Sequence, residues 1–170
     1  MILLASCTES DNSRINKSKE SQHVEAYIDG AADTLDVNGY INRARWYLAN
    51  QRVGNAIRDI NNALSIDGKN VDALLVLADI YYALGDQDNI LLTLNKATEI
   101  APLDSRPIIK LAELSFLQGN SAMANAYLDK ALELNSINPQ AYYMRGIICM
   151  SKNDTVQALK QFMKIGRAHV

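Results

Sequence analysis

Few residues in this chain are of types that carry out chemistry, and none has a partner at a useful spacing. A nucleophilic thiol needs an adjacent base or cation, and a metal site needs three or four ligands. The chain's thiols and imidazoles are Cys7, Cys149, His23 and His169. Cys149 falls at an apolar position of a repeat described below, so we expect a small packed side chain rather than a nucleophile. His23 lies in a polar leader, where we expect solvent.

Carboxylates and glycines add no further catalytic pattern. Asp86 and Asp88 fit a helix start and a solvated turn, and Gly85, Gly119 and Gly146 are isolated rather than gathered in a phosphate-binding loop. The sequence therefore predicts no catalytic residue, no cofactor, no metal site and no enzyme activity.

The composition narrows the remaining classes. The chain has 170 residues, with 17 Lys and Arg against 19 Asp and Glu, giving a net charge of −2. A general nucleic-acid binder needs a basic surface, so we exclude that class. Apolar residues make up 48%, while Gly and Pro number only 8 and 3, which disfavours a turn-rich β fold and disorder. One helical domain is the expectation.

A 34-residue period organises the middle of the chain. Residues 34 apart share a chemical type in four columns, which is the mark of a repeat architecture. The columns are Ala63, Ala97, Ala131; Tyr40, Leu74, Ile108, Tyr142; Ala44, Ala78, Ala112, Gly146; and Ile60, Leu94, Leu128, Phe162. Within one period, Leu74, Leu77, Ala78 and Tyr81 form a helical stripe that ends at Gly85. Ile90, Leu94 and Ala97 then form a second stripe, so each period predicts a helical hairpin.

Start signals support this interpretation. Asp86, Asn120 and Asp154 stand where second helices should begin, and each can accept the unpaired amide hydrogens of a first turn. Pro107 and Pro139 fall in or near the first turns of first helices.

These residues resemble the tetratricopeptide repeat, most closely through Leu74, Leu77-Ala78, Tyr81, Ala97 and Pro102. The resemblance implies an all-α fold, an α-solenoid of stacked antiparallel helical hairpins. It places repeats at 37–70, 71–104 and 105–138, and an incomplete one at 139–164. Helices stacked this closely need small side chains where the backbones approach. We assign that packing role to Ala44, Ala63, Ala78, Ala97, Ala112, Ala131 and Gly146.

The resemblance also implies a concave groove lined by the first helices. The groove-facing residues would be Ile41, Arg45, Leu48, Leu75, Asp79, Tyr82, Ile109, Glu113, Phe116, Tyr143, Ile147 and Met150. An apolar trough with two carboxylates suits a peptide with apolar anchors and a basic residue. The alternative is that these side chains pack against neighbouring first helices or against the chain's own leader.

The N-terminus predicts a lipid anchor. Leu4-Ala5-Ser6-Cys7 resembles a bacterial lipobox, which implies acylation of Cys7 and cleavage before it. Residues 1–7 would then be a truncated signal peptide, 8–22 a polar tether, and 23–36 a cap helix or half a degenerate repeat. The expected location is the bacterial cell envelope, in the periplasm or at the outer membrane. If residues 1–7 are instead an ordinary N-terminus, the protein would be cytoplasmic.

The opposite end, residues 165–170, is similar to the translation of a common sequencing adapter. We expect it not to belong to the natural protein, and His169 carries no weight in a site.

Three functions remain open from the sequence. The first is a non-catalytic scaffold, a lipid-anchored protein that binds a protein or peptide in its groove. The second is the interaction arm of a longer regulator or enzyme. The third, by analogy of fold alone, is a glycan-binding lipoprotein with Tyr82, Phe116 and Tyr143 as stacking platforms.

Overall fold

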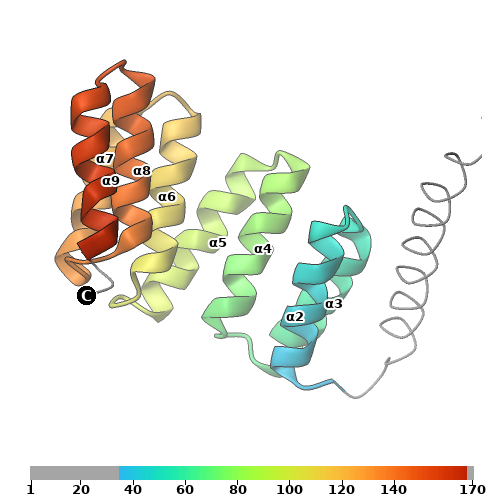
Figure 1. Ribbon diagram of the computed structural model, residues 1–170. Coiled ribbons are helices and arrows are strands. Elements are labelled where there is room, and N and C mark those ends of the chain that lie inside the picture. Colours follow the sequence, from blue (N-terminus) through green and yellow to red (C-terminus); the bar gives the residue numbers. More distant parts are fainter. Residues whose placement is uncertain (1–34, 168–170) are drawn as a thin grey trace, which may run out of the picture.

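The computed structural model describes residues 35–167, which form eight α-helices and no strand (Figure 1). The helices are α2 (Val37–Ala49), α3 (Val53–Ile66), α4 (Val71–Leu84), α5 (Gln87–Ile100), α6 (Ser105–Leu117), α7 (Ser121–Leu134), α8 (Pro139–Ser151) and α9 (Thr155–Arg167). First helices begin at residues 37, 71, 105 and 139, and second helices at 53, 87, 121 and 155. Both sets are spaced by the 34-residue period of the sequence.

Consecutive helices pair as hairpins, and the hairpins stack side by side in a curved row (Figure 1). Each second helix also packs on the first helix that follows it, so α3 contacts α4, α5 contacts α6, and α7 contacts α8. The predicted α-solenoid of antiparallel hairpins is therefore confirmed.

Side-chain caps start nearly every helix. As expected, Asp86, Asn120 and Asp154 accept backbone N–H bonds three residues ahead. A second column of caps, which the sequence analysis did not identify, starts the first helices at Asp36, Asn70, Asp104 and Asn138. Helix α3 is the exception, since Arg52 gives its N-terminus no side-chain cap.

The turn inside each hairpin uses one residue in the left-handed conformation. These residues are Gln51, Gly85, Gly119 and Asn153, with φ of 59°, 72°, 79° and 60°, and they too are 34 apart. Glycine adopts this conformation without steric cost, whereas a side chain there is strained. The middle two hairpins therefore have the favoured turn residue, and the first hairpin has a strained one.

The core runs along the solenoid axis as three apolar clusters. The six alanines assigned to packing are all 2% exposed or less, and Gly146 is buried as well. Cys149 differs from our expectation of a buried side chain, because it is only half-buried. It lies on α8, the last first helix that the structure describes, and no following first helix covers it there.

A buried ion pair joins the two helices of the first hairpin, and the sequence analysis did not predict it. The guanidinium of Arg43 donates to both carboxylate oxygens of Asp59, with Nε–Oδ2 and Nη2–Oδ1 distances of 2.5 and 2.9 Å. Asp59 has no exposed surface. This bond raises the pKa of Arg43, which keeps the guanidinium charged inside the hairpin.

The N-terminal predictions fall largely outside the described part of the chain. Cys7, His23, residues 8–22 and almost all of 23–36 lie there, and so do residues 168–170. Helix α9 ends at Arg167, three residues into the segment that resembles an adapter. Among the described helices, none has the length and apolar character needed to cross a bilayer.

Candidate binding groove

The junction between α4 and α6 differs from the other junctions between first helices. Helix α2 packs on α4 and α6 packs on α8, whereas the backbones of α4 and α6 approach one another less closely. Val76 on α4 and Met144 on α8 are buried against the preceding hairpin, with exposed fractions of 2% and 9%. The residue 34 positions after Val76 and 34 before Met144 is Lys110. A lysine cannot bury its ammonium without a partner, so an ion pair replaces the apolar contact at this level, while Leu75 of α4 still packs with Leu111 and Leu114 of α6.

Ion pairs bridge the open junction. The ammonium of Lys110 on α6 donates to Oδ1 of Asp79 on α4. One turn away, Nη1 of Arg106 lies 2.6 Å from Oδ1 of Asp72. Arg106 also pairs with Asp104 at 2.7 Å, and this bond lowers the pKa of the Asp104 carboxyl and raises that of the guanidinium. In all three ion pairs the basic side chain lies on α6. Two of its acidic partners, Asp72 and Asp79, lie on α4, and the third, Asp104, caps α6 itself.

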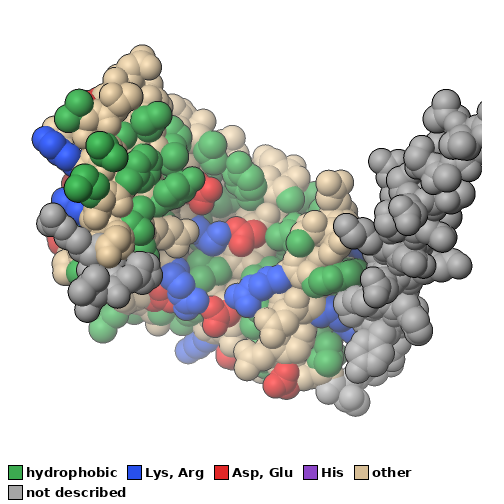
Figure 2. Space-filling view, in the orientation of Figure 1, with side chains coloured by type: hydrophobic (Ala, Val, Ile, Leu, Met, Phe, Trp, Pro, Cys, Tyr) green, Lys and Arg blue, Asp and Glu red, His purple; other side chains and the backbone are tan. Residues whose placement is uncertain are grey.

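A cavity of about 270 Å³ lies at this junction, and we call it the α4–α6 cavity. Its floor is apolar and its mouth is charged. It is lined by Ala78, Asp79 and Tyr82 from α4, Ile90 and Leu94 from α5, and Lys110, Glu113, Leu114 and Leu117 from α6. A second hollow continues it toward the turn between α4 and α5, sharing Tyr82, Ile90, Leu114 and Leu117. Figure 2 shows acidic and basic side chains adjoining in the hollowed middle of this face.

One carboxylate of the cavity has no partner among residues 35–167. Asp79 is paired with Lys110, but Glu113 is exposed and forms no hydrogen bond or ion pair with any described residue. Counting Asp79, Lys110 and Glu113, the lining has a net charge of −1. Tyr82 and Leu117 face the same space and are 55% and 53% exposed.

Three residues predicted to face the groove are buried instead, which corrects that part of the prediction. Ile41, Leu75 and Ile109 each pack into a core cluster that includes residues of the following first helix. In each of these repeats, the first helix of the next repeat covers the side chain at the fifth position. Such burial leaves no surface for a ligand, as the packing alternative anticipated.

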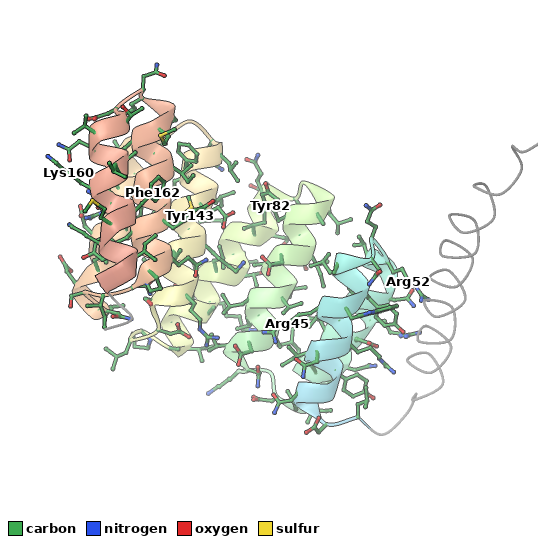
Figure 3. All side chains as sticks on the ribbon, in the orientation of Figure 1. Arg45, Arg52, Tyr82, Tyr143, Lys160 and Phe162 are labelled. Atoms are coloured by element: carbon green, nitrogen blue, oxygen red, sulfur yellow. The ribbon has the colours of Figure 1, made fainter. Side chains whose placement is uncertain are left out.

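The other predicted residues differ in how far they are exposed. Arg45, Tyr82 and Glu113 are exposed and Asp79 is half-buried, all on first helices (Figure 3 labels Arg45 and Tyr82). Leu48 and Phe116 are partly buried because they pack on the core. Ile147 is half-buried, and Tyr143 and Met150 are exposed, on the last described first helix. The Tyr143 ring lies 6.0 Å from that of Phe162 on α9.

Several lining residues escaped sequence reasoning. Ile90 and Leu94 fall in a predicted helical stripe, and the sequence analysis did not single out Leu114. All three belong to the core and also line the cavity. Lys110 is the residue from which the sequence could have indicated this cavity, because it interrupts an otherwise apolar column at Val76 and Met144.

The described residues contain no cluster of metal-ligand side chains that would compete with the groove. No three His, Cys, Asp or Glu side chains gather among them in a way that could hold a metal ion. The groove is therefore the strongest candidate that these residues provide.

Comparisons with known proteins agree with the architecture. A family model described as tetratricopeptide repeat matches residues 41–105 and 110–166. No curated protein matches the chain.

Solved structures show the same fold. The Cut9–Hcn1 hetero-tetramer of the APC/C matches with a TM-score of 0.69 and 19% identity, covering 78% of this chain and 26% of that one. This chain thus spans about a quarter of that protein. TTC0263, a protein of Thermus thermophilus, matches with a TM-score of 0.69 and 21% identity, covering 76% and 72%. MamA matches with a TM-score of 0.62 and 16% identity, covering 98% and 96%.

Proposed function

The chain belongs to the tetratricopeptide repeat family, whose fold is typical of protein-interaction scaffolds, and from this premise we propose that it is a non-catalytic scaffold that binds a partner segment in the α4–α6 cavity. The observation that carries the proposal is the exposure of Tyr82 and Leu117 at that cavity. A large apolar side chain at a concave, partly apolar site gains free energy when a partner covers it, at about 25 cal/mol per Å².

The contrast with the neighbouring repeats supports this location. The residues equivalent to Tyr82 are Leu48 and Phe116, and both pack against the core. Among the described repeats, only the α4–α6 junction leaves such a side chain largely uncovered while a following first helix is present. One fold relative, Cut9–Hcn1, is a hetero-tetramer, which accords with a role in assembly.

The test compares partners captured by three forms of the protein. Tyr82→Ala combined with Leu117→Ala removes the two large exposed apolar side chains of the cavity. Leu92→Ala removes an exposed leucine from α5, 67% exposed and outside the cavity, and serves as the control. Quantitative mass spectrometry after chemical cross-linking should show partners lost from the double variant and retained by the control. Identical partners in all three samples would remove the cavity from consideration.

The lipid anchor remains part of the proposal on the strength of Leu4-Ala5-Ser6-Cys7. Labelling of cells with a radioactive fatty acid should mark the wild-type protein and not Cys7→Ser. Equal incorporation into both would overturn the anchor and with it the location in the bacterial envelope.

No observation favours the glycan alternative. Of the three rings proposed as platforms, Phe116 packs against the core and Tyr143 lies against Phe162. The arm of a longer regulator is compatible with the same cavity, because either protein would use it to hold a partner.

A further inference from the structure

We propose that the α4–α6 cavity binds one lysine or arginine side chain of the partner segment, with the cation at Glu113 and the aliphatic stem against Tyr82, Leu114 and Leu117. This inference rests on the proposed function, because it names the chemistry of the segment that the same cavity takes.

The charge of the cavity selects a cation. Lys110 and Asp79 satisfy one another, and Arg106 is satisfied by Asp72 and Asp104. Glu113 alone among the charged lining residues forms no ion pair within the described part of the chain. An incoming cation would complete a second ion pair, whereas an incoming carboxylate would face Glu113 and Asp79 together.

The distribution of apolar surface selects a long stem. Ile90, Leu94 and Leu114 form the floor, and the charged groups stand beside it on α4 and α6. Lysine and arginine have this same division, an apolar stem with a charged end. A wholly apolar side chain would cover the floor but would also strip water from Glu113 without replacing it.

Tyr82 adds a third contact. Its exposed ring borders the cavity on the α4 side, across from Glu113 on α6. The aliphatic stem of a lysine or arginine would pack along this ring while its cation reaches Glu113, and the ring gains free energy when such a stem covers it. The two walls therefore favour the same kind of guest.

The experiment uses short fluorescein-labelled peptides that are identical except at one central position. That position holds Lys, Arg, norleucine or Glu, and leucine and serine flank it on both sides. Binding to the full chain is measured by fluorescence anisotropy at low salt. We expect the Lys and Arg peptides to bind about five- to tenfold more tightly than the norleucine peptide, and the Glu peptide to bind most weakly.

Matched variants assign the preference to one carboxylate. Glu113→Gln should bring the Lys and norleucine peptides to within about twofold of each other. Glu99→Gln changes an exposed glutamate on α5 outside the cavity and should leave the preference intact. Both glutamates are exposed, so equal thermal melting of the two variants checks that the fold is unchanged.

The outcomes separate the two proposals. If peptides bind through Tyr82 and Leu117 but Lys and norleucine bind equally, the basic-residue inference fails and the groove remains. A preference for Lys that survives Glu113→Gln also overturns the inference. If no peptide binds, or if Tyr82→Ala with Leu117→Ala changes nothing, the groove itself fails.

Discussion

Gly146 on α8 faces the ring of Phe162 on α9 so closely that a Cβ at position 146 would overlap the ring atoms Cε1, Cζ and Cδ1. The equivalent pairs in the middle repeats are Ala78 with Leu94 and Ala112 with Leu128. The larger ring thus faces the smaller residue. The combined volume of the two side chains therefore stays nearly constant from one repeat to the next. Figure 3 shows Phe162 on the side of α9 that turns toward α8.

Gly146→Ala should therefore destabilise the fold by about 1 to 3 kcal/mol, because the half-buried ring must move. Gly146→Ala with Phe162→Leu should recover most of that loss, since it reproduces the pair of the middle repeats. Urea denaturation measures both. Gly54→Ala is the control, because nothing lies within 4 Å of the added Cβ. It should stabilise α3 by about 0.5 to 1 kcal/mol. No recovery in the double variant would contradict this account of the packing.

The left-handed turn residue of the first hairpin is suboptimal. Gln51 adopts φ of 59°, where the equivalent residues Gly85 and Gly119 carry no strain. Gln51→Gly should raise the free energy of unfolding by about 0.5 to 1 kcal/mol, because the relief of strain exceeds the added freedom of the unfolded chain. The melting temperature reports the gain. Gln118→Gly, with an ordinary φ of −75°, should produce none. A lower melting temperature for Gln51→Gly would argue against the left-handed turn.

The buried pair of Arg43 and Asp59 should be costly to break. Asp59→Ala leaves the guanidinium buried without its carboxylate, and we expect a loss of about 3 to 5 kcal/mol. Glu133→Ala, an exposed carboxylate on α7, should change stability by less than about 0.5 kcal/mol. Guanidinium denaturation at fixed pH compares the two. Similar small effects in both variants would mean that the pair is open to solvent.

The pair of Asp79 and Lys110 should be weak by contrast, because 44% and 25% of the two side chains is exposed. A double-mutant cycle with Asp79→Asn and Lys110→Met should give a coupling of about 0.2 to 1 kcal/mol that falls as salt is added. A coupling as large as that of a buried pair would show that the junction excludes water, and the cavity would then be closed to partners.

Asp104 predicts a specific dependence of stability on pH. Its side chain accepts from the backbone N–H and the guanidinium of Arg106, which hold its pKa below the usual 3.8. A carboxyl with a lowered pKa in the folded state contributes stability above its unfolded pKa, and this contribution is lost as the pH falls below that value. Asp104→Asn should therefore be less stable than the wild type at pH 7, with a gap that narrows as the pH falls below about 4. Thermal melts from neutral to acidic pH test this, and a gap independent of pH would contradict it.

The sequence determined the repeat architecture. The columns that begin at Ala44, Tyr40 and Ile60 are set by packing between neighbours in one hairpin, and such local packing repeats whenever the sequence does. The period, the helix pairs and the caps at Asp86, Asn120 and Asp154 follow from short-range chemistry, so periodicity was sufficient to find them.

Only the tertiary structure decided how neighbouring hairpins meet. Ile41, Leu75 and Ile109 share a helix stripe with Arg45, Asp79 and Glu113, yet the next first helix covers the former and leaves the latter accessible. The ion pair between α4 and α6 requires Lys110 to meet Asp79 across two repeats, and the buried pair requires Arg43 to meet Asp59 across a turn. A one-dimensional period assigns a residue to a face of its helix. The distance to the adjacent helix, which separates core from groove, exists only when the hairpins are stacked.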